Sequence, residues 1–258
     1  MALNNYLSER LTSTGERKTL LMTHVVCGYP SFDANWKALE IMQEVGVDMV
    51  ELQFPFSEPS ADGPLFVKAN QMAIENGVHV DDCFEFMKKV TDAFSFKVVM
   101  MGYYNTVFKT GHRAFMQRLK EAGGEGFILP DLPVEEANEL HNIAQELDLS
   151  PIVLMTPTNS DKRLAQLAEY ADGFIYVVAR KGVTGSDTNM DNEVANFIAR
   201  CRSFTELPLA VGFGVTQAQD ISFIGQHADI AVIGTAALKA WETGQEAALR
   251  AFFEQLLN

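Results

Sequence analysis

The chain has 258 residues, of which 47% are hydrophobic and 21% are charged, so it can bury a large core and is not of the disordered class. It carries 20 Lys and Arg residues against 34 Asp and Glu residues, and the formal net charge of −14 excludes a surface for nucleic acid or for an anionic membrane. We therefore expect no nucleic acid and no membrane among its partners, whereas a small anionic substrate held by backbone N–H groups is compatible with this charge.

The cysteines and the first residues indicate the cellular compartment. Cys27, Cys83 and Cys201 lie far apart and form no CxxC pair, so the sequence predicts neither a disulfide framework nor a zinc knuckle. Residues 1–18 lack the apolar segment of a signal peptide, and no stretch approaches the ~18 apolar residues of a membrane span. We expect a cytoplasmic protein.

Short, β-rich apolar runs alternate with longer helical patterns along the whole chain. Several runs are nearly continuous hydrophobics, such as KVVMM and DIAVI, which is typical of parallel strands covered on both faces. The predicted strands are 20–26, 49–53, 97–101, 126–129, 151–155, 173–178, 208–211 and 229–233.

Amphipathic helical patterns fill the intervals between these runs. The first begins with a cap signal at Ser31 and ends at Gly46. The predicted helices are 31–45, 81–94, 113–122, 134–147, 162–171, 193–204, 217–225 and 245–257, with an additional helix at 64–76 after the second strand. This alternation predicts a single-domain (β/α)8 barrel, the TIM-barrel architecture, over residues 1–258. A doubly wound open sheet is the alternative.

Two carboxylates stand out near the second strand. Glu51 lies within the strand, and alternation places it on the face opposite Val50 and Leu52. A barrel strand has no solvent face and an unpaired buried carboxylate is costly, so we interpret Glu51 as functional rather than as a surface residue. Asp62 follows in the sequence ADGP, where spacing alone favours a turn or helix-cap role before Pro64.

Glycines follow the last two strands. Gly212-Phe213-Gly214 comes after the seventh strand, and Gly234-Thr235 comes after the eighth, before a short helix expected near Thr235. A single GxG usually marks a turn, but the ends of strands seven and eight are where such barrels hold phosphate. The pair therefore predicts a phosphate site. The polar segment 179–191 after strand six is either a mobile loop or a lid over the substrate.

Two kinds of site are not predicted, because the motifs that form them do not occur in the sequence. The five histidines form no HxH or HxxxH grouping, so we predict no metal. Neither GxxxxGK[ST] nor GxGxxG occurs, which argues against a nucleotide phosphate site.

Seven ordered motifs spread over nearly the whole chain resemble one family. They are Val50-Glu51-Leu52, Pro55-Phe56-Ser57, Ala61-Asp62-Gly63-Pro64, Tyr103-Tyr104-Asn105, Asp131-Leu132-Pro133-Val134-Glu135-Glu136, Arg180-Lys181-Gly182-Val183-Thr184-Gly185 and Gly212-Phe213-Gly214. Together these motifs resemble the tryptophan synthase alpha chain family. The resemblance implies a carbon–carbon lyase that cleaves indole-3-glycerol phosphate to indole and glyceraldehyde 3-phosphate in L-tryptophan biosynthesis. It also implies no cofactor in this chain and a pyridoxal-phosphate-dependent beta chain as partner, in an alpha2-beta2 heterotetramer.

The resemblance also implies roles for individual residues. Glu51 would carry the proton transfers, and Asp62 would stabilise the positive charge that develops around the indole nitrogen. The substrate-binding positions are Tyr176, Gly185, Gly212, Phe213, Gly214, Gly234 and Thr235, the last standing where the family more often has a serine.

Other positions depart from the family pattern. Gln53 and Phe54 stand where a glycine and a small aliphatic residue are common, Glu58 replaces an aspartate, and His24 replaces an aromatic hydrophobe. Two alternatives therefore stay open: an alpha-like subunit that only activates a beta partner, and another phosphate-binding barrel of the isomerase or epimerase type. The epimerases generally need metal-binding His and Asp sets at several strand ends, which this sequence does not supply.

Overall fold

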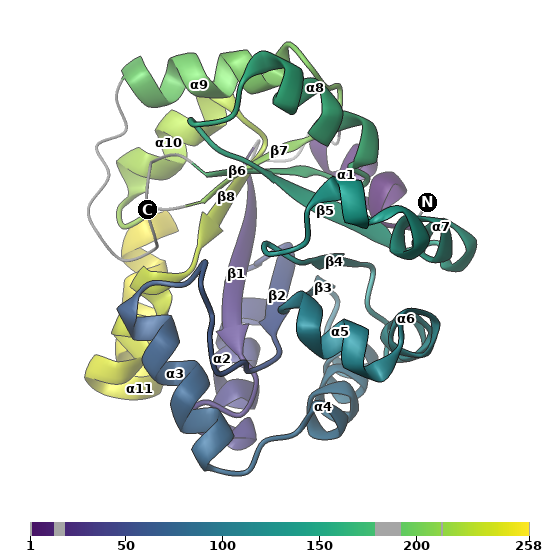
Figure 1. The fold of residues 1–258 in the computed structure, drawn as a ribbon. Coiled ribbons are helices and arrows are strands. Elements are labelled where there is room, and N and C mark those ends of the chain that lie inside the picture. The colour runs from purple at the N-terminus through teal and green to yellow at the C-terminus, as the bar shows by residue number, and fades with distance from the viewer. Residues whose placement is uncertain (1, 13–18, 179–191, 213, 258) are drawn as a thin grey trace.

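The chain folds into a closed barrel of parallel strands in the order β1 to β8, with helices around the outside (Figure 1). A computed structural model describes residues 2–12, 19–178, 192–212 and 214–257. The strands are β1 Leu20–Val26, β2 Met49–Gln53, β3 Lys97–Met101, β4 Gly126–Ile128, β5 Ser150–Met155, β6 Ile175–Val178, β7 Leu209–Gly212 and β8 Ile230–Ile233. The predicted barrel is thus confirmed, and the open sheet is excluded because β1 also pairs with β8, with Leu20 opposite Ile230.

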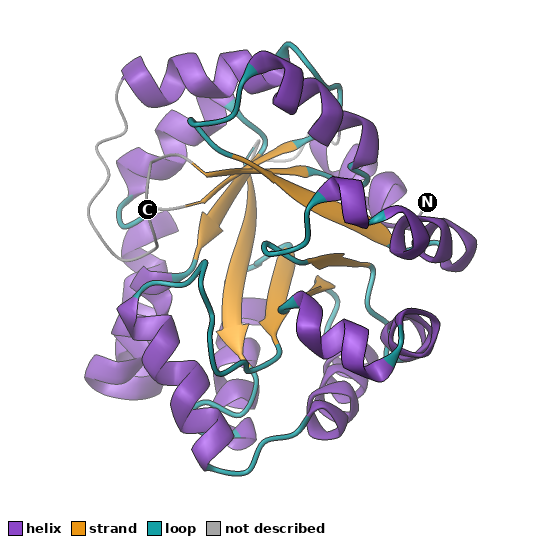
Figure 2. Cartoon of the chain, in the orientation of Figure 1, coloured by secondary structure: helices purple, strands orange, loops and turns teal. Residues whose placement is uncertain are grey.

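The helices form the outer layer (Figure 2). They are α1 Ala2–Thr12, α2 Phe32–Glu44, α3 Pro64–Glu75, α4 Val80–Ala93, α5 Tyr104–Thr110, α6 His112–Glu121, α7 Asn138–Leu147, α8 Asp161–Tyr170, α9 Asn192–Arg202, α10 Ala218–His227 and α11 Thr235–Leu257, with a 3-10 turn η1 at Val134–Glu136. The additional helix after the second strand is α3. The helix predicted at 134–147 is divided into η1 and α7. The helices expected near 235 and at 245–257 are joined in α11 across a kink at Gly244 and Gln245.

Strand residues alternate between two apolar layers. Leu21 and Val50 pack outward against the helices, whereas Leu20, Met22 and Met49 belong to a separate cluster inside the barrel. Because successive side chains of a strand point to opposite faces, the residues that share the parity of Met49 on β2 point inward. Glu51 is one of them, and it lies on the face opposite Val50 and Leu52, as predicted.

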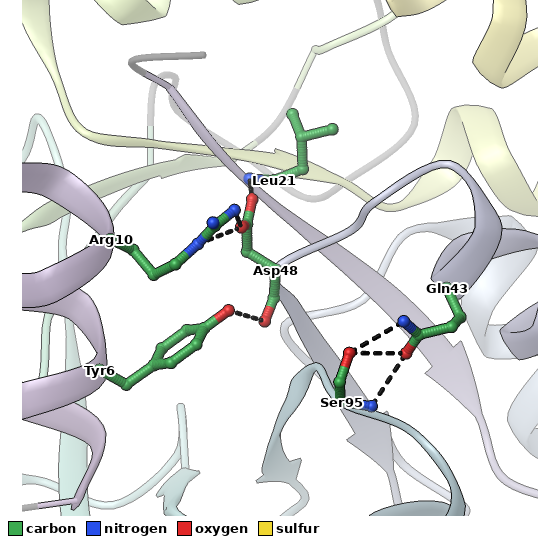
Figure 3. Close-up of polar contacts among 6 residues, drawn as sticks. All are labelled: Tyr6, Arg10, Leu21, Gln43, Asp48 and Ser95. Carbon is green, nitrogen blue, oxygen red and sulfur yellow. Dashed lines mark hydrogen bonds and ion pairs between the residues drawn. The ribbon is translucent and has the colours of Figure 1, made fainter. Parts of the chain in front are cut away.

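Two helices, α1 and α5, were not predicted. The first of them, α1, closes the amino-terminal end of the barrel. Its Leu3 and Leu7 are buried in the inner cluster. Its Tyr6 hydroxyl donates to the backbone oxygen of Asp48 at 3.0 Å, and Arg10 Nε donates to Asp48 Oδ1 at 3.0 Å (Figure 3). The other unpredicted helix is α5, which follows β3.

Asp48 connects this closing helix to the strands. Its Oδ2 accepts the backbone N–H of Leu21 on β1 at 2.9 Å, and the residue itself directly precedes β2. Nearby, Gln43 of α2 binds the segment before β3: its Oε1 accepts the Ser95 N–H at 2.9 Å and its Nε2 donates to Ser95 Oγ at 2.8 Å (Figure 3). The Asp48 contacts fix the start of β2, the strand that carries Glu51.

Candidate active site

Glu51 lies at the centre of β2, opposite His24 on β1 and Val99 on β3. Its side chain points into the barrel, the residue is only 3% exposed, and Oε2 has no hydrogen-bond partner among the described residues. Burial, followed by the nearby charge of Asp62, raises the pKa of Glu51 to about 8. Glu51 is therefore mainly a protonated acid at neutral pH.

Asp62 lies in the loop between β2 and α3, and it is 7% exposed. Its Oδ2 accepts hydrogen bonds from Gln53 Nε2 at 2.6 Å and from the Tyr103 hydroxyl at 3.1 Å. Burial raises the pKa of Asp62 to about 6, while these two hydrogen bonds favour the charged form and oppose the rise. At neutral pH the site thus holds one carboxyl that is mainly protonated beside one that is mainly ionised.

Tyr176 on β6 faces the same space. Burial, followed by the charges of Glu51 and Asp62, raises the pKa of its hydroxyl, so the tyrosine is neutral and lies within electrostatic reach of both carboxyls. A Cβ on Gly212 would stand 2.5 Å from the Tyr176 hydroxyl oxygen. The absence of a side chain at 212 therefore makes room for the tyrosine ring.

The glycine positions expected to hold phosphate follow β7 and β8. Gly214 has φ +125°, which disfavours any residue with a side chain. Thr235 begins α11, so free backbone N–H groups of that helix lie directly after Gly234. A Cβ on Gly234 would lie 3.5 Å from the Phe66 ring and 3.8 Å from His24 Cβ. The expected contacts at Gly185 and Phe213, and the segment 179–191, lie outside the described residues.

Three polar residues of the site were not among the expected binding or catalytic positions. Tyr103 and Gln53 hold Asp62, and His24 Nε2 lies 2.8 Å from Gln53 Oε1. Alternation contained the signal for two of them, because Gln53 shares the inward parity of Glu51 and His24 shares that of Met22. Each therefore points toward the barrel interior from the carboxyl-terminal half of its strand.

The described residues provide neither a metal site nor a membrane-spanning helix. No group of three or more His, Cys, Asp or Glu side chains in that part of the chain could hold a metal ion. No helix there is long and apolar enough to cross a membrane.

Comparison with known proteins identifies the family. A family model described as the tryptophan synthase alpha chain matches residues 11–256. The chain belongs to the tryptophan synthase alpha chain family. A curated member from Syntrophotalea carbinolica is 44% identical over 241 residues, which is 93% of this chain and 95% of that protein. The tryptophan synthase of Saccharomyces cerevisiae is 37% identical over 236 residues, which is 89% of this chain and 33% of the yeast protein.

Solved structures agree with this membership. A Mycobacterium tuberculosis tryptophan synthase structure superposes with a TM-score of 0.89 and 30% identity, covering 98% of this chain and 96% of that chain. A Pyrococcus furiosus structure, described as a basis of mutual activation of its a2b2 complex, gives 0.86 and 30%, with 92% and 97% covered. As a member of the tryptophan synthase alpha chain family, this chain is a lyase-type enzyme that carries out the alpha reaction of tryptophan biosynthesis.

Proposed function

We propose that the chain cleaves indole-3-glycerol phosphate to indole and glyceraldehyde 3-phosphate by a retro-aldol reaction. It would do so as one catalytic domain over residues 1–258, in the cytoplasm. The observation that carries the proposal is the pair of buried carboxyls, whose surroundings raise the pKa of Glu51 to about 8 and that of Asp62 to about 6. Titratable groups with separated pKa values in one site mark the acid and the base of a reaction.

Glu51 supplies the proton transfers in this proposal. Its acid form donates a proton to C3 of the indole ring, which allows the bond between C3 and C3′ of the glycerol chain to break. The bonding electron pair returns to the indole ring, and the C3′ hydroxyl becomes the aldehyde. The carboxylate left on Glu51 accepts the hydroxyl proton, so the side chain ends the cycle protonated as it began.

Asp62 and Tyr176 act on the bound substrate. Protonation at C3 places positive charge on the indole nitrogen, and the ionised Asp62 accepts a charge-assisted hydrogen bond from that N–H. Gln53 and Tyr103 supply fixed donors to Asp62, which keep it ionised and oriented. Tyr176 contacts the substrate as a neutral side chain within reach of both carboxyls.

The phosphate is proposed to lie at the carboxyl ends of β7 and β8. The site comprises Gly212, Gly214, Gly234 and Thr235, joined by Gly185 and Phe213. The start of α11 and the turn at Gly214 present backbone N–H groups to an anion, so the net charge of −14 does not prevent binding. The reaction needs no cofactor in this chain.

The partner is proposed to be a pyridoxal-phosphate-dependent beta chain, in an alpha2-beta2 heterotetramer. Family membership supports this, as does the a2b2 assembly described for the Pyrococcus furiosus relative. Indole is small and apolar, so direct transfer to a second site avoids its loss to solution. A partner that prefers the substrate-bound form would raise turnover, and ~10-fold activation needs only ~1.4 kcal/mol of differential binding.

One assay tests the proposal. Purified chain is mixed with indole-3-glycerol phosphate, and indole release is measured alone and during titration with the cognate beta chain. We expect release in both cases and faster release with the partner. Activation of the beta chain without indole release at any ratio would indicate an alpha-like activator. Turnover of another phosphorylated substrate, with no indole released, would indicate a different barrel enzyme.

A further inference from the structure

Four side chains form a continuous line of hydrogen bonds near Glu51. Tyr103 donates to Asp62 Oδ2 at 3.1 Å, and Gln53 Nε2 donates to the same oxygen at 2.6 Å. The other end of the Gln53 amide, Oε1, lies 2.8 Å from His24 Nε2. The opposite ring nitrogen, His24 Nδ1, lies 3.6 Å from Glu51 Oε1. The hydrogen bonds therefore run from Tyr103 through Asp62 and Gln53 to His24, whose ring lies against the second carboxyl.

The ionised Asp62 determines the direction of every bond in this line. A carboxylate only accepts, so Gln53 must turn its NH2 group toward Asp62 and its carbonyl oxygen toward His24. That oxygen also only accepts, so His24 Nε2 must carry the ring proton. In a neutral imidazole the other nitrogen is then an acceptor. The lone pair of His24 Nδ1 consequently faces Glu51.

The surroundings keep the histidine neutral and in place. Burial lowers the pKa of His24 to about 4, against a partial opposing effect from its bond to Gln53. Its ring stacks on Phe66 with 4.3 Å between centroids and 28° between planes. Since the histidine is neutral and Glu51 is mainly protonated, their 3.6 Å approach is a contact between an acid and an acceptor rather than an ion pair.

We propose that His24 and Gln53 are positioning residues for the alpha reaction. The Asp62 carboxylate, acting through the Gln53 amide, selects the His24 tautomer whose Nδ1 accepts a hydrogen bond from the protonated Glu51 carboxyl and so orients this acid for transfer. The inference rests on the proposed function, because it assigns Glu51 and Asp62 their roles. At 3.6 Å the two atoms lie beyond hydrogen-bond distance, so the proposal requires the Glu51 carboxyl to move several tenths of an ångström toward the ring. The acid proton is then held on the oxygen that faces the histidine.

The groups facing Glu51 come from several elements. His24 on β1 is neutral, Asp62 in the loop after β2 is ionised, and Tyr176 on β6 is a neutral hydroxyl. On β3 the opposite residue, Val99, is apolar. His24 is thus the neutral acceptor that lies against the Glu51 carboxyl, and its removal should favour loss of the Glu51 proton.

The first test needs no substrate. In the full chain labelled with ¹⁵N-histidine, the nitrogen–proton correlation spectrum should show one histidine as the Nε2–H tautomer from about pH 6 to 8, and His24→Phe should remove that signal. Gln53→Met keeps a similar length but has no carbonyl oxygen, so the His24 signal should become a mixture of tautomers. A pure Nδ1–H tautomer in the parent chain would overturn the inference.

The second test is kinetic and uses the complex with the beta chain. His24→Phe keeps the stack on Phe66 but removes both nitrogens. We expect kcat to fall ~10-fold with KM changed less than ~2-fold. The alkaline limb of the plot of kcat/KM against pH should move at least ~0.5 pH unit lower, because the protonated form of Glu51 loses one hydrogen bond. Gln53→Met should also move the acid limb to higher pH, because Asp62 loses a hydrogen-bond donor that lowers its pKa. His24→Asn, which retains an acceptor near the Nδ1 position, should restore part of kcat.

A matched control is available on α10, where His227 is exposed and also contacts a phenylalanine ring, with 4.7 Å between its centroid and that of Phe223. His227→Phe should leave both limbs in place. Parent-like kcat and limbs in His24→Phe would overturn the inference while leaving the proposed function intact. Absence of indole release by the parent complex would instead contradict the proposed function, and the nitrogen spectrum would still decide the tautomer.

Discussion

Gly212 lies against the ring of Tyr176 so closely that an added Cβ would stand 2.5 Å from the tyrosine hydroxyl oxygen. Gly212→Ala should therefore displace the Tyr176 ring and lower kcat/KM ~10-fold or more, with ~1–3 kcal/mol of destabilisation from overpacking. The measurement is steady-state turnover together with thermal unfolding. Combining Gly212→Ala with Tyr176→Ala should be much less harmful than the sum of the two changes, because the collision disappears with the ring. Additive losses would mean that Gly212 acts independently of the tyrosine.

Replacing Glu51 tests the proton transfers directly. Glu51→Gln keeps the shape of the side chain but cannot exchange a proton, so kcat should fall by at least ~100-fold while KM changes little. Glu44→Gln, on α2 and paired with Arg250 at the surface, serves as the control and should retain parent activity. Near-normal turnover of Glu51→Gln would remove this carboxyl from the mechanism.

The same substitution should alter stability in a pH-dependent way. The pKa of Glu51 is raised from 4.5 to about 8, so the folded state keeps a proton that the unfolded state releases between these values. Unfolding is therefore increasingly favoured as pH rises through this window, by about 5 kcal/mol in total. Gln does not titrate, so the Tm of Glu51→Gln minus that of the parent should increase as pH rises from about 5 to about 8. A constant Tm difference over that range would contradict the raised pKa.

The two carboxyls should produce a bell-shaped rate profile. Activity needs Asp62 ionised and Glu51 protonated, so kcat/KM should fall as pH drops below about 6 and as it rises above about 8. The two limbs belong to the interacting pair rather than to isolated residues. They are measured by kcat/KM against pH in buffers of constant ionic strength. Activity that continues to rise well above the upper limb would mean that ionised Glu51 is the reactive form.

The proposed phosphate site can be tested with two glycines of different geometry. Gly214→Val places a β-branched residue at φ +125° and obstructs the turn, so glycerol phosphate binding should weaken much more than binding of free indole. Gly234→Ala adds a methyl group with only ordinary contacts to Phe66 and His24, so any loss of glycerol phosphate affinity there reports on the phosphate site rather than on the fold. Calorimetric titration with both ligands gives the comparison. Equal losses for indole and glycerol phosphate would indicate misfolding.

The alternation of β-rich runs with helical patterns was sufficient to predict the barrel, and the period of two within a strand was sufficient to place Glu51 on the face opposite Val50 and Leu52. The first residues also carry a helical pattern, although α1 was not predicted there: Leu3, Tyr6, Leu7 and Leu11 have the spacing of one helical face. These apolar residues are interspersed with polar ones, so the segment has no continuous apolar run. Their partners, such as Asp48, are far away in sequence and become visible only when the barrel closes.

The polar contacts of the site depend on registers that a single sequence does not show. The family resemblance drew attention to Asp62, whereas spacing alone favoured a turn or cap role. Gln53 reaches His24 because β1 pairs with β2 in a register that places Val26 opposite Gln53, and it reaches Asp62 because the loop after β2 folds back over the end of the strand. Positions that depart from the family pattern were recognised, but their hydrogen-bond partners required the fold.

The seam between β1 and β8 has a consequence for biosynthesis of the chain. The strands that meet there, with Leu20 opposite Ile230, are about 210 residues apart. At ~5–20 residues per second a ribosome needs ~10–40 s to make the intervening segment, and until then β1 has one edge without its native neighbour. The nascent protein therefore passes through a period in which an apolar strand can pair with other chains. Slower translation of the last third should lower the yield of assembled barrel before it affects any property of the finished enzyme.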